Sequence, residues 1–185
     1  MHSRIRPFVV GGVLLVGFGA VALFSGCASA STAAGMTTAV ATPAAAKHSQ
    51  SVVVQVTGGS ETNSMGASQI SSADFASAIQ TSIAQSGLFA KLAPAADADY
   101  EIDVHIVRLT QPTFGLSFTV TMEADWSLVL RSQKKTVWEK AITSTFTATV
   151  SDAFAGVKRL RLANEGAAKK NIEDAITQIS ALTLP

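Results

Sequence analysis

The chain contains few charged residues, few aromatic residues and a single cysteine. Charged side chains make up 15% of its 185 residues, below the roughly 25% typical of soluble domains. Fourteen basic residues face 13 acidic ones, and this balance excludes a nucleic-acid binder that works by bulk positive charge. With Cys27 as its one cysteine, the chain cannot form an internal disulfide, so its core alone must stabilise the fold.

The sequence also lacks the motifs of common active sites. It contains no Gly-x-Ser-x-Gly, no phosphate-binding loop and no zinc-spaced pair of ligands. Of its three histidines, only His105 lies in the part that we expect to fold. We therefore predict no enzymatic activity, no catalytic or metal site and no cofactor; an enzyme would have to be built around His105.

An apolar run follows a short basic segment at the N-terminus. Residues 1–7 include two arginines and no acid, and residues 8–24 carry no charge, which is the order of an export signal. The run ends in Phe24-Ser25-Gly26-Cys27. This motif resembles the bacterial lipobox, with Phe24 in place of the usual leucine. In a lipobox, an apolar residue and two small residues precede a cysteine that is lipidated and becomes the first residue.

The resemblance implies that residues 1–26 are a lipoprotein signal peptide and that Cys27 carries acyl chains such as palmitate, which anchor the protein in a membrane. In Gram-negative bacteria the residue after this cysteine steers sorting, and Ala28 resembles the outer-membrane class. This resemblance implies an outer membrane lipoprotein that faces the periplasm. In other bacteria it implies a lipoprotein on the extracytoplasmic face of the cell membrane. The alternative is an uncleaved helix, since residues 8–26 are long enough to cross a bilayer.

Residues 28–50 consist largely of alanine, serine and threonine and carry almost no charge. They lack the large apolar side chains that form a core. We therefore predict that residues 27–50 are the lipidated cysteine and a flexible tether. Residues 51–185 are long enough for one core, and we predict a single α+β domain there.

Hydrophobic spacing predicts the elements of this domain. Apolar residues recur every fourth position between Ser72, a suitable N-cap, and Gly87, a suitable C-cap, as in an amphipathic helix. A second apolar stripe predicts a helix from Ser151 or Asp152 to about Leu182. Alternating or β-branched runs predict strands near 51–56, 88–92, 100–106, 116–130 and 138–150.

The last two strands form a long antiparallel hairpin in this interpretation. Their inward residues are even-numbered, which favours a loop of three or five residues and pairs Leu130 with Trp138. The C-terminal helix matches the hairpin in length, and its small residues, Ala163 and 166–168, leave room for the aromatic side chains. We predict an α+β two-layer sandwich, with a mainly antiparallel sheet and two helices on one face.

Two groups of charged residues are candidate binding sites. An acidic group on the solvent face of the sheet comprises Glu101, Asp103, His105, Glu123 and Asp125. It has the ligands for a hard cation, but same-face neighbours on a strand lie nearly 7 Å apart. We favour a solvated face balanced by Lys140 and Arg131. A basic group on the last helix comprises Lys158, Arg159, Arg161, Lys169 and Lys170.

The basic group allows two interpretations. It is either a patch for a phosphate-bearing lipid or an acidic partner, or a solvated helix face. We favour the solvated face because Arg161, Lys169 and Lys170 each have an acidic neighbour four residues later. The composition of residues 159–168 is unusual, and either partner contact or close packing would account for it.

The order of elements behind the lipobox loosely resembles the auxiliary lipoproteins of envelope transport systems, including lipid-trafficking ABC transporters. It implies a membrane-anchored, periplasm-facing, non-enzymatic accessory or assembly factor of a cell-envelope complex, with an envelope protein as partner and no nucleic acid. The resemblance covers topology and anchoring, so Cys27 is the only residue to which it assigns a role. The alternative is a carrier of a lipid or small hydrophobe between the small-residue helix and the aromatic sheet.

Overall fold

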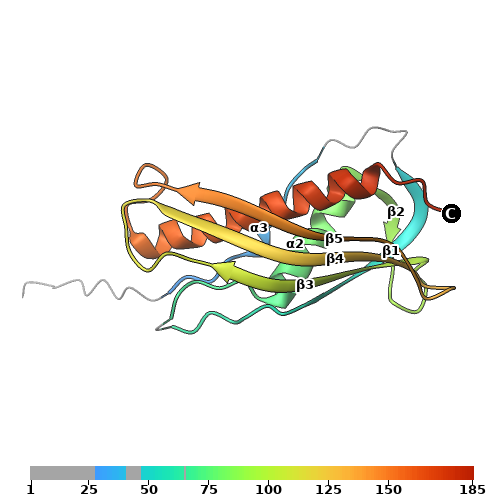
Figure 1. Cartoon of the computed structure of the whole chain (residues 1–185), viewed down its shortest axis with the longest axis horizontal. Coiled ribbons are helices and arrows are strands. Elements are labelled where there is room, and N and C mark those ends of the chain that lie inside the picture. The colour runs from blue at the N-terminus through green and yellow to red at the C-terminus, as the bar shows by residue number, and fades with distance from the viewer. Residues whose placement is uncertain (1–27, 41–46, 65) are drawn as a thin grey trace, which may run out of the picture.

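The computed structural model describes residues 28–40, 47–64 and 66–185, and within them it has the predicted α+β class (Figure 1). The elements in chain order are α1 (Ala33–Met36), β1 (His48–Thr57), α2 (Ser72–Ser86), β2 (Phe89–Leu92), β3 (Tyr100–Thr110), β4 (Phe118–Leu130), β5 (Lys135–Ala148) and α3 (Gly156–Ser180). The predicted helices and strands are therefore present, and α1 is an additional element. The helix α2 is capped by Ser71, one residue before the predicted cap.

The five strands form one mixed sheet in the order β2-β1-β3-β4-β5. The strands β3, β4 and β5 pair antiparallel along most of their lengths. The strand β1 is parallel to both of its neighbours. The helix α2 crosses over between β1 and β2 and brings the chain back in the same direction, and residues 93–99 then lead to β3 on the other side of β1. Figure 1 shows α2 and α3 on the same side of the sheet, as predicted.

The core lies between this helical layer and the sheet. On β4 the even-numbered residues from Phe118 to Leu128 are buried, which confirms the alternation in the sequence. They face the small residues of α3, of which Ala163, Ala167 and Ala168 are fully buried. A side chain on Gly166 would overlap the ring of Phe146, so the predicted role of the small residues is confirmed at this contact.

The hairpin register differs from the prediction by two residues. Leu128, and not Leu130, lies opposite Trp138. The loop spans residues 131–134, an even number, and a β-bulge between Leu128 and Val129 restores the parity of the inward residues. An extra residue on one strand shifts the pairing without turning the inward side chains outward beyond the bulge. The predicted loop of three or five residues is therefore wrong. The inward-facing set is correct for β4 from Phe118 to Leu128, but it is wrong for Leu116 and Val150, which are 77% and 46% exposed because they lie beyond the ends of β4 and β5.

The predicted tether is wrong for the part of it that the structure describes. Residues 33–36 form α1, Met36 is fully buried in the core, and Ser31 and Thr38 are buried as well. This segment packs against both α2 and α3. The composition of this segment wrongly indicated flexibility, because one methionine and a few hydroxyl groups suffice to hold a short segment against two helices. The strand β1 also begins at His48, before the predicted start at residue 51. The prediction that only His105 lies in the folded part is therefore wrong, because His48 is buried and its Nε2 is 3.1 Å from the Ile179 carbonyl oxygen.

The helix α3 begins at Gly156, later than predicted, because the preceding residues form a turn. Asp152 accepts hydrogen bonds from the backbone N–H and the hydroxyl of Thr149, at 2.7 and 2.9 Å. The backbone hydrogen bond, and to a smaller extent the hydroxyl one, holds the pKa of the Asp152 carboxyl below its usual range. The carboxylate thus stabilises a turn between β5 and α3 and does not cap the helix.

A buried asparagine joins α3 to the two hairpin strands. Asn171 is fully buried, and its Oδ1 accepts a hydrogen bond from Trp126 Nε1 on β4 at 2.7 Å. Its Nδ2 donates to the Ile142 carbonyl and the Ser144 hydroxyl on β5, at 3.0 and 3.1 Å. Because buried polar groups are costly when unpaired, these bonds favour one position of α3 along the hairpin.

Replacing this asparagine tests its role. We expect Asn171→Leu to lower the free energy of unfolding by about 2–4 kcal/mol, because it leaves the Trp126 N–H and the Ile142 carbonyl unpaired in the core. Urea unfolding followed by circular dichroism measures the loss. Trp126→Phe serves as the matched partner in a double-mutant cycle, in which the two losses should not add. Full additivity would show that the two side chains do not interact.

Candidate functional site

The segment directly after the predicted lipidation site is bonded to the folded domain. Cys27 itself lies outside the described residues, as do the predicted signal peptide and residues 8–26. Ala28 donates its N–H to the Ser64 carbonyl at 3.3 Å, and Ser31 donates its N–H to the Gln69 carbonyl at 3.2 Å. Arg161 of α3 donates from Nη1 to the Ser29 hydroxyl at 2.9 Å. The chain is therefore fixed to the domain from the first described residue onward.

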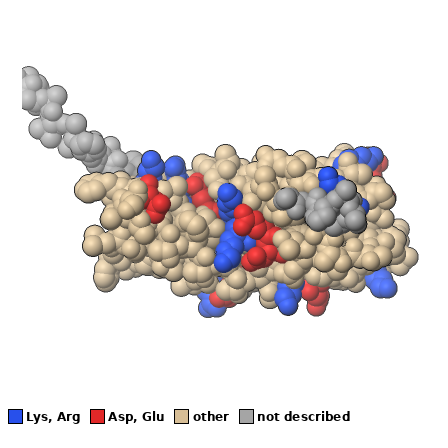
Figure 2. Space-filling model, turned by 90° about the horizontal axis from the view of Figure 1, so that it is seen from above, with Lys and Arg blue, Asp and Glu red and all other residues tan. Residues whose placement is uncertain are grey.

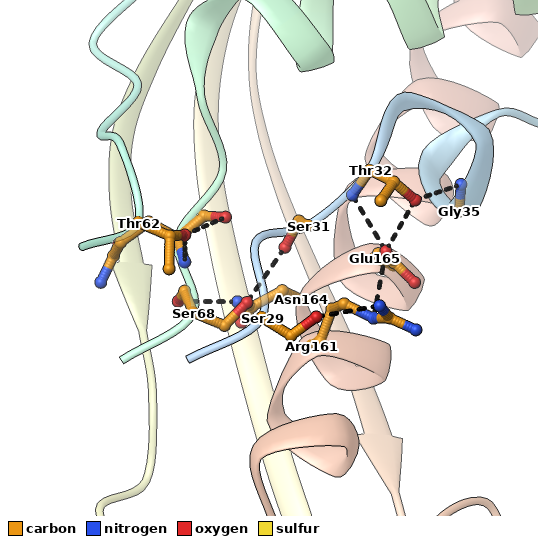
Figure 3. Close-up of polar contacts among 10 residues, drawn as sticks. Ser29, Ser31, Thr32, Gly35, Thr62, Ser68, Arg161, Asn164 and Glu165 are labelled. Carbon is orange, nitrogen blue, oxygen red and sulfur yellow. Dashed lines mark hydrogen bonds and ion pairs between the residues drawn. The ribbon is translucent and has the colours of Figure 1, made fainter. Parts of the chain in front are cut away.

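Glu165 of α3 holds the next part of this segment. Its Oε1 accepts hydrogen bonds from the N–H and the hydroxyl of Thr32, at 2.9 and 3.0 Å, and lies 3.7 Å from Arg161 Nε. The Glu165 side chain is only 7% exposed. Thr32 in turn caps α1 by accepting from the Gly35 N–H, and any side chain at Gly35 would overlap the Glu165 carboxylate. Figure 3 shows these groups converging on α3.

Asn164, also on α3, binds two further segments. It is fully buried and donates from Nδ2 to the Ser68 carbonyl at 2.9 Å. Gln111, after β3, donates from Nε2 to both Asn164 Oδ1 and the Ser68 carbonyl, at 2.8 and 2.7 Å. We call the side chains that bring these segments together the anchor clamp, consisting of Ser29, Thr32, Ser68, Arg161, Asn164 and Glu165 (Figure 3).

Arg159 binds the two loops at the start of α3. It is 6% exposed, and its Nη1 donates to the carbonyls of Ala153 and Phe154, at 2.9 and 2.6 Å. Its Nη2 donates to the Gly115 carbonyl at 3.2 Å, and the guanidinium lies 5.1 Å from the centroid of the Phe118 ring. A buried cation thus joins the β3–β4 loop to the β5–α3 turn, and its charge faces carbonyl oxygens and an aromatic ring.

These contacts explain the unusual composition of residues 159–168 by internal packing. Only the three lysines of the predicted basic group, Lys158, Lys169 and Lys170, are exposed on the surface. Arg159 instead binds the two loops, and Arg161 binds Ser29 in the clamp. The predicted pair of Arg161 with Glu165 is present. The pairs of Lys169 and Lys170 with acids four residues later are not formed in the part of the chain that the structure describes. Glu173 accepts instead from the Thr38 hydroxyl at 2.6 Å.

The acidic group lies on the open face of the sheet, where β3 and β4 are neighbours as the cation hypothesis required. Glu101 pairs with Arg131, and Arg108 donates to both oxygens of Glu123 at 2.9 Å. Burial, then the nearby Glu101 charge, raises the pKa of the Asp103 carboxyl above its usual range. Within residues 28–40, 47–64 and 66–185, no three carboxylate, histidine or cysteine side chains are placed to hold a metal ion.

The remaining groups of this face also form ordinary surface contacts. His105 lies opposite Asp125 in the register and shares a hydrogen bond of 3.0 Å with the Thr57 hydroxyl. Lys140 lines the same shallow depression as Asp103 and Asp125. Sequence analysis missed Arg108 as a balancing charge, because a bulge between Ile106 and Arg108 moves it to the open face. The arrangement has the paired charges of a solvated sheet face.

Comparison with known proteins shows the fold. No family model and no curated protein matches this sequence. A solved structure from Xanthomonas campestris, of family DUF330, is 14% identical with a TM-score of 0.59, over 76% of this chain and 89% of that one. A hypothetical protein from Chlamydia trachomatis is 9% identical with a TM-score of 0.52, over 72% and 99%. A lipoprotein from Neisseria meningitidis is 12% identical with a TM-score of 0.43, over 72% and 99%.

At these identities the likeness to solved structures shows a shared fold and assigns a function to no residue. The helices of the described residues are also too short or too polar to cross a membrane.

Removing the clamp carboxylate tests whether it holds the N-terminal segment. In Glu165→Ala, we expect the amides of residues 29–37 to exchange hydrogen at least tenfold faster, because Thr32 loses the acceptor for its N–H and its hydroxyl. Hydrogen-exchange mass spectrometry of this peptide measures the change. The control is Glu139→Ala, which removes an exposed carboxylate from β5. Equal exchange in both variants would contradict the role of Glu165.

Proposed function

We propose that this chain is a bacterial envelope lipoprotein, anchored by acyl chains on Cys27, that acts without enzymatic activity as an accessory or assembly factor of a cell-envelope complex. The observation that carries the proposal is the anchor clamp. It begins two residues after Cys27 and fixes the chain to α3 through Ser29 and Thr32. A lipid on Cys27 would therefore sit directly against the domain.

This connection differs in kind from a flexible tether. A random coil over residues 28–50 would give the domain a reach of roughly 25 Å and free rotation. With residues 28–38 bonded to the domain, an anchored protein stays at the membrane surface with one end towards the lipid. A fixed position suits a protein that binds another membrane component, because it raises the effective concentration of the two binding surfaces relative to each other.

The polar groups of the described residues support a role without chemistry. Three of the buried ones, Asn164, Glu165 and Asn171, form hydrogen bonds that connect elements of the fold. Arg159 and Arg161 do so through their Nη atoms, whereas their buried Nε atoms have no hydrogen-bond partner among the described residues.

His105, around which an enzyme would have to be built, is exposed on the open face of the sheet and bonded to Thr57. It lines an open depression together with Asp103, Asp125 and Lys140. Within the part of the chain that the structure describes, the one hydrogen bond of its ring is to the Thr57 hydroxyl, as in an ordinary surface contact.

The alternative carrier function needs space between α3 and the sheet. The centre of this interface is packed, because Ala163, Ala167 and Ala168 are fully buried and Met122 and Trp126 are at most 2% exposed. A cavity of about 510 Å³ lies at its edge between β5 and α3, and its lining includes Phe146 and the charged side chains Lys169 and Glu173. A lipid at the centre would have to displace core side chains, and an acyl chain in the cavity would bury charged groups at a cost. We therefore prefer the accessory role to the carrier role.

The proposed location follows from the sequence beside the anchor. Ala28 resembles the residue of the outer-membrane class, so in a bacterium with two membranes we propose an outer membrane lipoprotein that faces the periplasm. With one membrane, the domain lies on its extracytoplasmic face. The partner is an envelope protein that this attachment brings within reach.

Copurification of the acylated protein tests the proposed function. The full-length chain is expressed in its host, extracted from envelopes with a mild detergent and compared with Cys27→Ser by intact mass and quantitative mass spectrometry. We expect the acyl mass and a stoichiometric envelope protein with the wild type, and the loss of both with Cys27→Ser. Ser132→Ala, in the exposed turn of the hairpin, is the control and should retain both.

Two results would contradict the proposal. An unacylated wild-type chain that retains residues 1–26 would exclude the lipoprotein. An acylated chain that carries a bound lipid and no protein partner would favour the carrier function instead.

A further inference from the structure

Three of the most exposed apolar side chains lie in two neighbouring loops. In the β3–β4 loop, Phe114 is 86% exposed and Leu116 is 77% exposed, and in the β5–α3 turn Phe154 is 95% exposed. We call Phe114, Leu116 and Phe154 the apolar tip. Soluble domains rarely expose a cluster of large apolar side chains without a partner that covers it.

The tip is held in place by the buried arginine described above. Arg159 donates to the carbonyl of Phe154 in one loop and to the carbonyl of Gly115, between Phe114 and Leu116, in the other. Gly115 has a φ of +144°, which side-chain-bearing residues rarely adopt. The two loops are therefore joined at or beside the residues that carry the exposed side chains. The tip thus has a fixed conformation.

The tip carries almost no charge. Residues 111–117 include no charged side chain, and residues 149–157 include only Asp152, which is bonded to Thr149. In Figure 2 the outermost surface at the left end, where these loops lie in Figure 1, is free of Lys, Arg, Asp and Glu. Lys158, which follows directly on α3, is exposed, so a charge borders the tip without covering it.

The tip and the proposed anchor lie at the same end of the molecule. Arg159 binds the tip, and Arg161, two residues later on α3, binds Ser29. Two residues correspond to about 3 Å along a helix. Figure 1 shows the segment that starts at residue 28 entering the fold beside the first turns of α3 and the β3–β4 loop. Side chains two positions apart point to different sides of a helix, so an acyl chain on Cys27 would leave the domain at the same end as the tip and beside it along α3.

We propose that the apolar tip inserts into the interfacial region of the lipid bilayer beside the acyl anchor, so that the domain is attached to the membrane at two points. This inference rests on the proposed acylation of Cys27. Aromatic and aliphatic side chains gain free energy at the boundary between headgroups and acyl chains. The bilayer is the occupant because the anchor brings this end of the domain to it, whereas a second copy would have to reach the same end in competition with lipid.

Site-directed spin labelling of the acylated protein tests this proposal. A cysteine is introduced by Ala155→Cys, beside Phe154, and the full-length protein is reconstituted in vesicles of phosphatidylethanolamine and phosphatidylglycerol. We expect the nitroxide at residue 155 to collide severalfold less with a water-soluble nickel chelate, and more with oxygen, than the same label at Ser132→Cys. Both residues are exposed, and residue 132 lies in the β4–β5 turn at the far end of the sheet (Figure 1).

A second variant separates the tip from the anchor. With Phe114→Ser and Phe154→Ser added to Ala155→Cys, the protein remains acylated, and we expect the label to become as accessible to nickel as at residue 132. Equal nickel accessibility at residues 155 and 132 in the unaltered tip would overturn the proposal. Dipolar broadening of the spectrum at residue 155 would overturn it in favour of a second copy.

Labelling of the parent chain distinguishes this failure from failure of the proposed function. An acylated Cys27 is a thioether and takes no label, so only the introduced cysteine reacts. If the parent chain itself becomes labelled, Cys27 is free and the proposed acylation is wrong. If it stays unlabelled while residue 155 is fully accessible to nickel, the protein is a lipoprotein whose tip does not enter the bilayer.

Discussion

The rest of this structure depends on the polar contacts made by the first turns of α3. Arg159, Arg161, Asn164 and Glu165 bind backbone or hydroxyl groups of the β3–β4 loop, the β5–α3 turn, the segment before α2 and the segment that starts at residue 28. The same turns place small residues such as Ala163 and Ala167 against the sheet. Because α3 lies close to the sheet, these polar groups are buried, and buried polar groups require hydrogen-bond partners. The packing of α3 on the sheet therefore also determines where the loops and the N-terminal segment lie.

The periodic part of the fold was predictable from the sequence. Strand β4 alternates because one face packs on α3 and the other meets solvent, so its pattern predicts both the strand and its buried side. The helix α2 was predictable for the same reason, with caps at both ends. The register was not, because the bulge between Leu128 and Val129 is a local choice that the alternation does not encode. Helix α1 was missed because composition does not show which surface a short segment will meet.

The clamp was only partly visible in the sequence. Residues 159–168 were unusual in composition, and the spacing of Arg161 and Glu165 correctly predicts their ion pair. The same spacing suggests an exposed charged face, however, whereas Arg159 is buried under carbonyl groups of two loops. Those partners are backbone atoms, which no side-chain pattern identifies. A signal was present in Asn164, a polar residue within an apolar helical stripe, which requires a buried partner.

Attachment at the clamp has a consequence that a longer linker would remove. A lipid on a flexible chain holds a domain near a membrane but leaves its rotation free. Binding of a partner must then select one orientation, and the loss of rotational entropy reduces the binding free energy. A chain bonded from Ala28 through Thr38 to the segment before α2 and to α3 loses most of that freedom when the protein folds. If the tip formed by Phe114, Leu116 and Phe154 also enters the bilayer, the remaining rotation is removed as well. The open face of the sheet then has one direction relative to the membrane, which places its charged groups at a defined height for a partner.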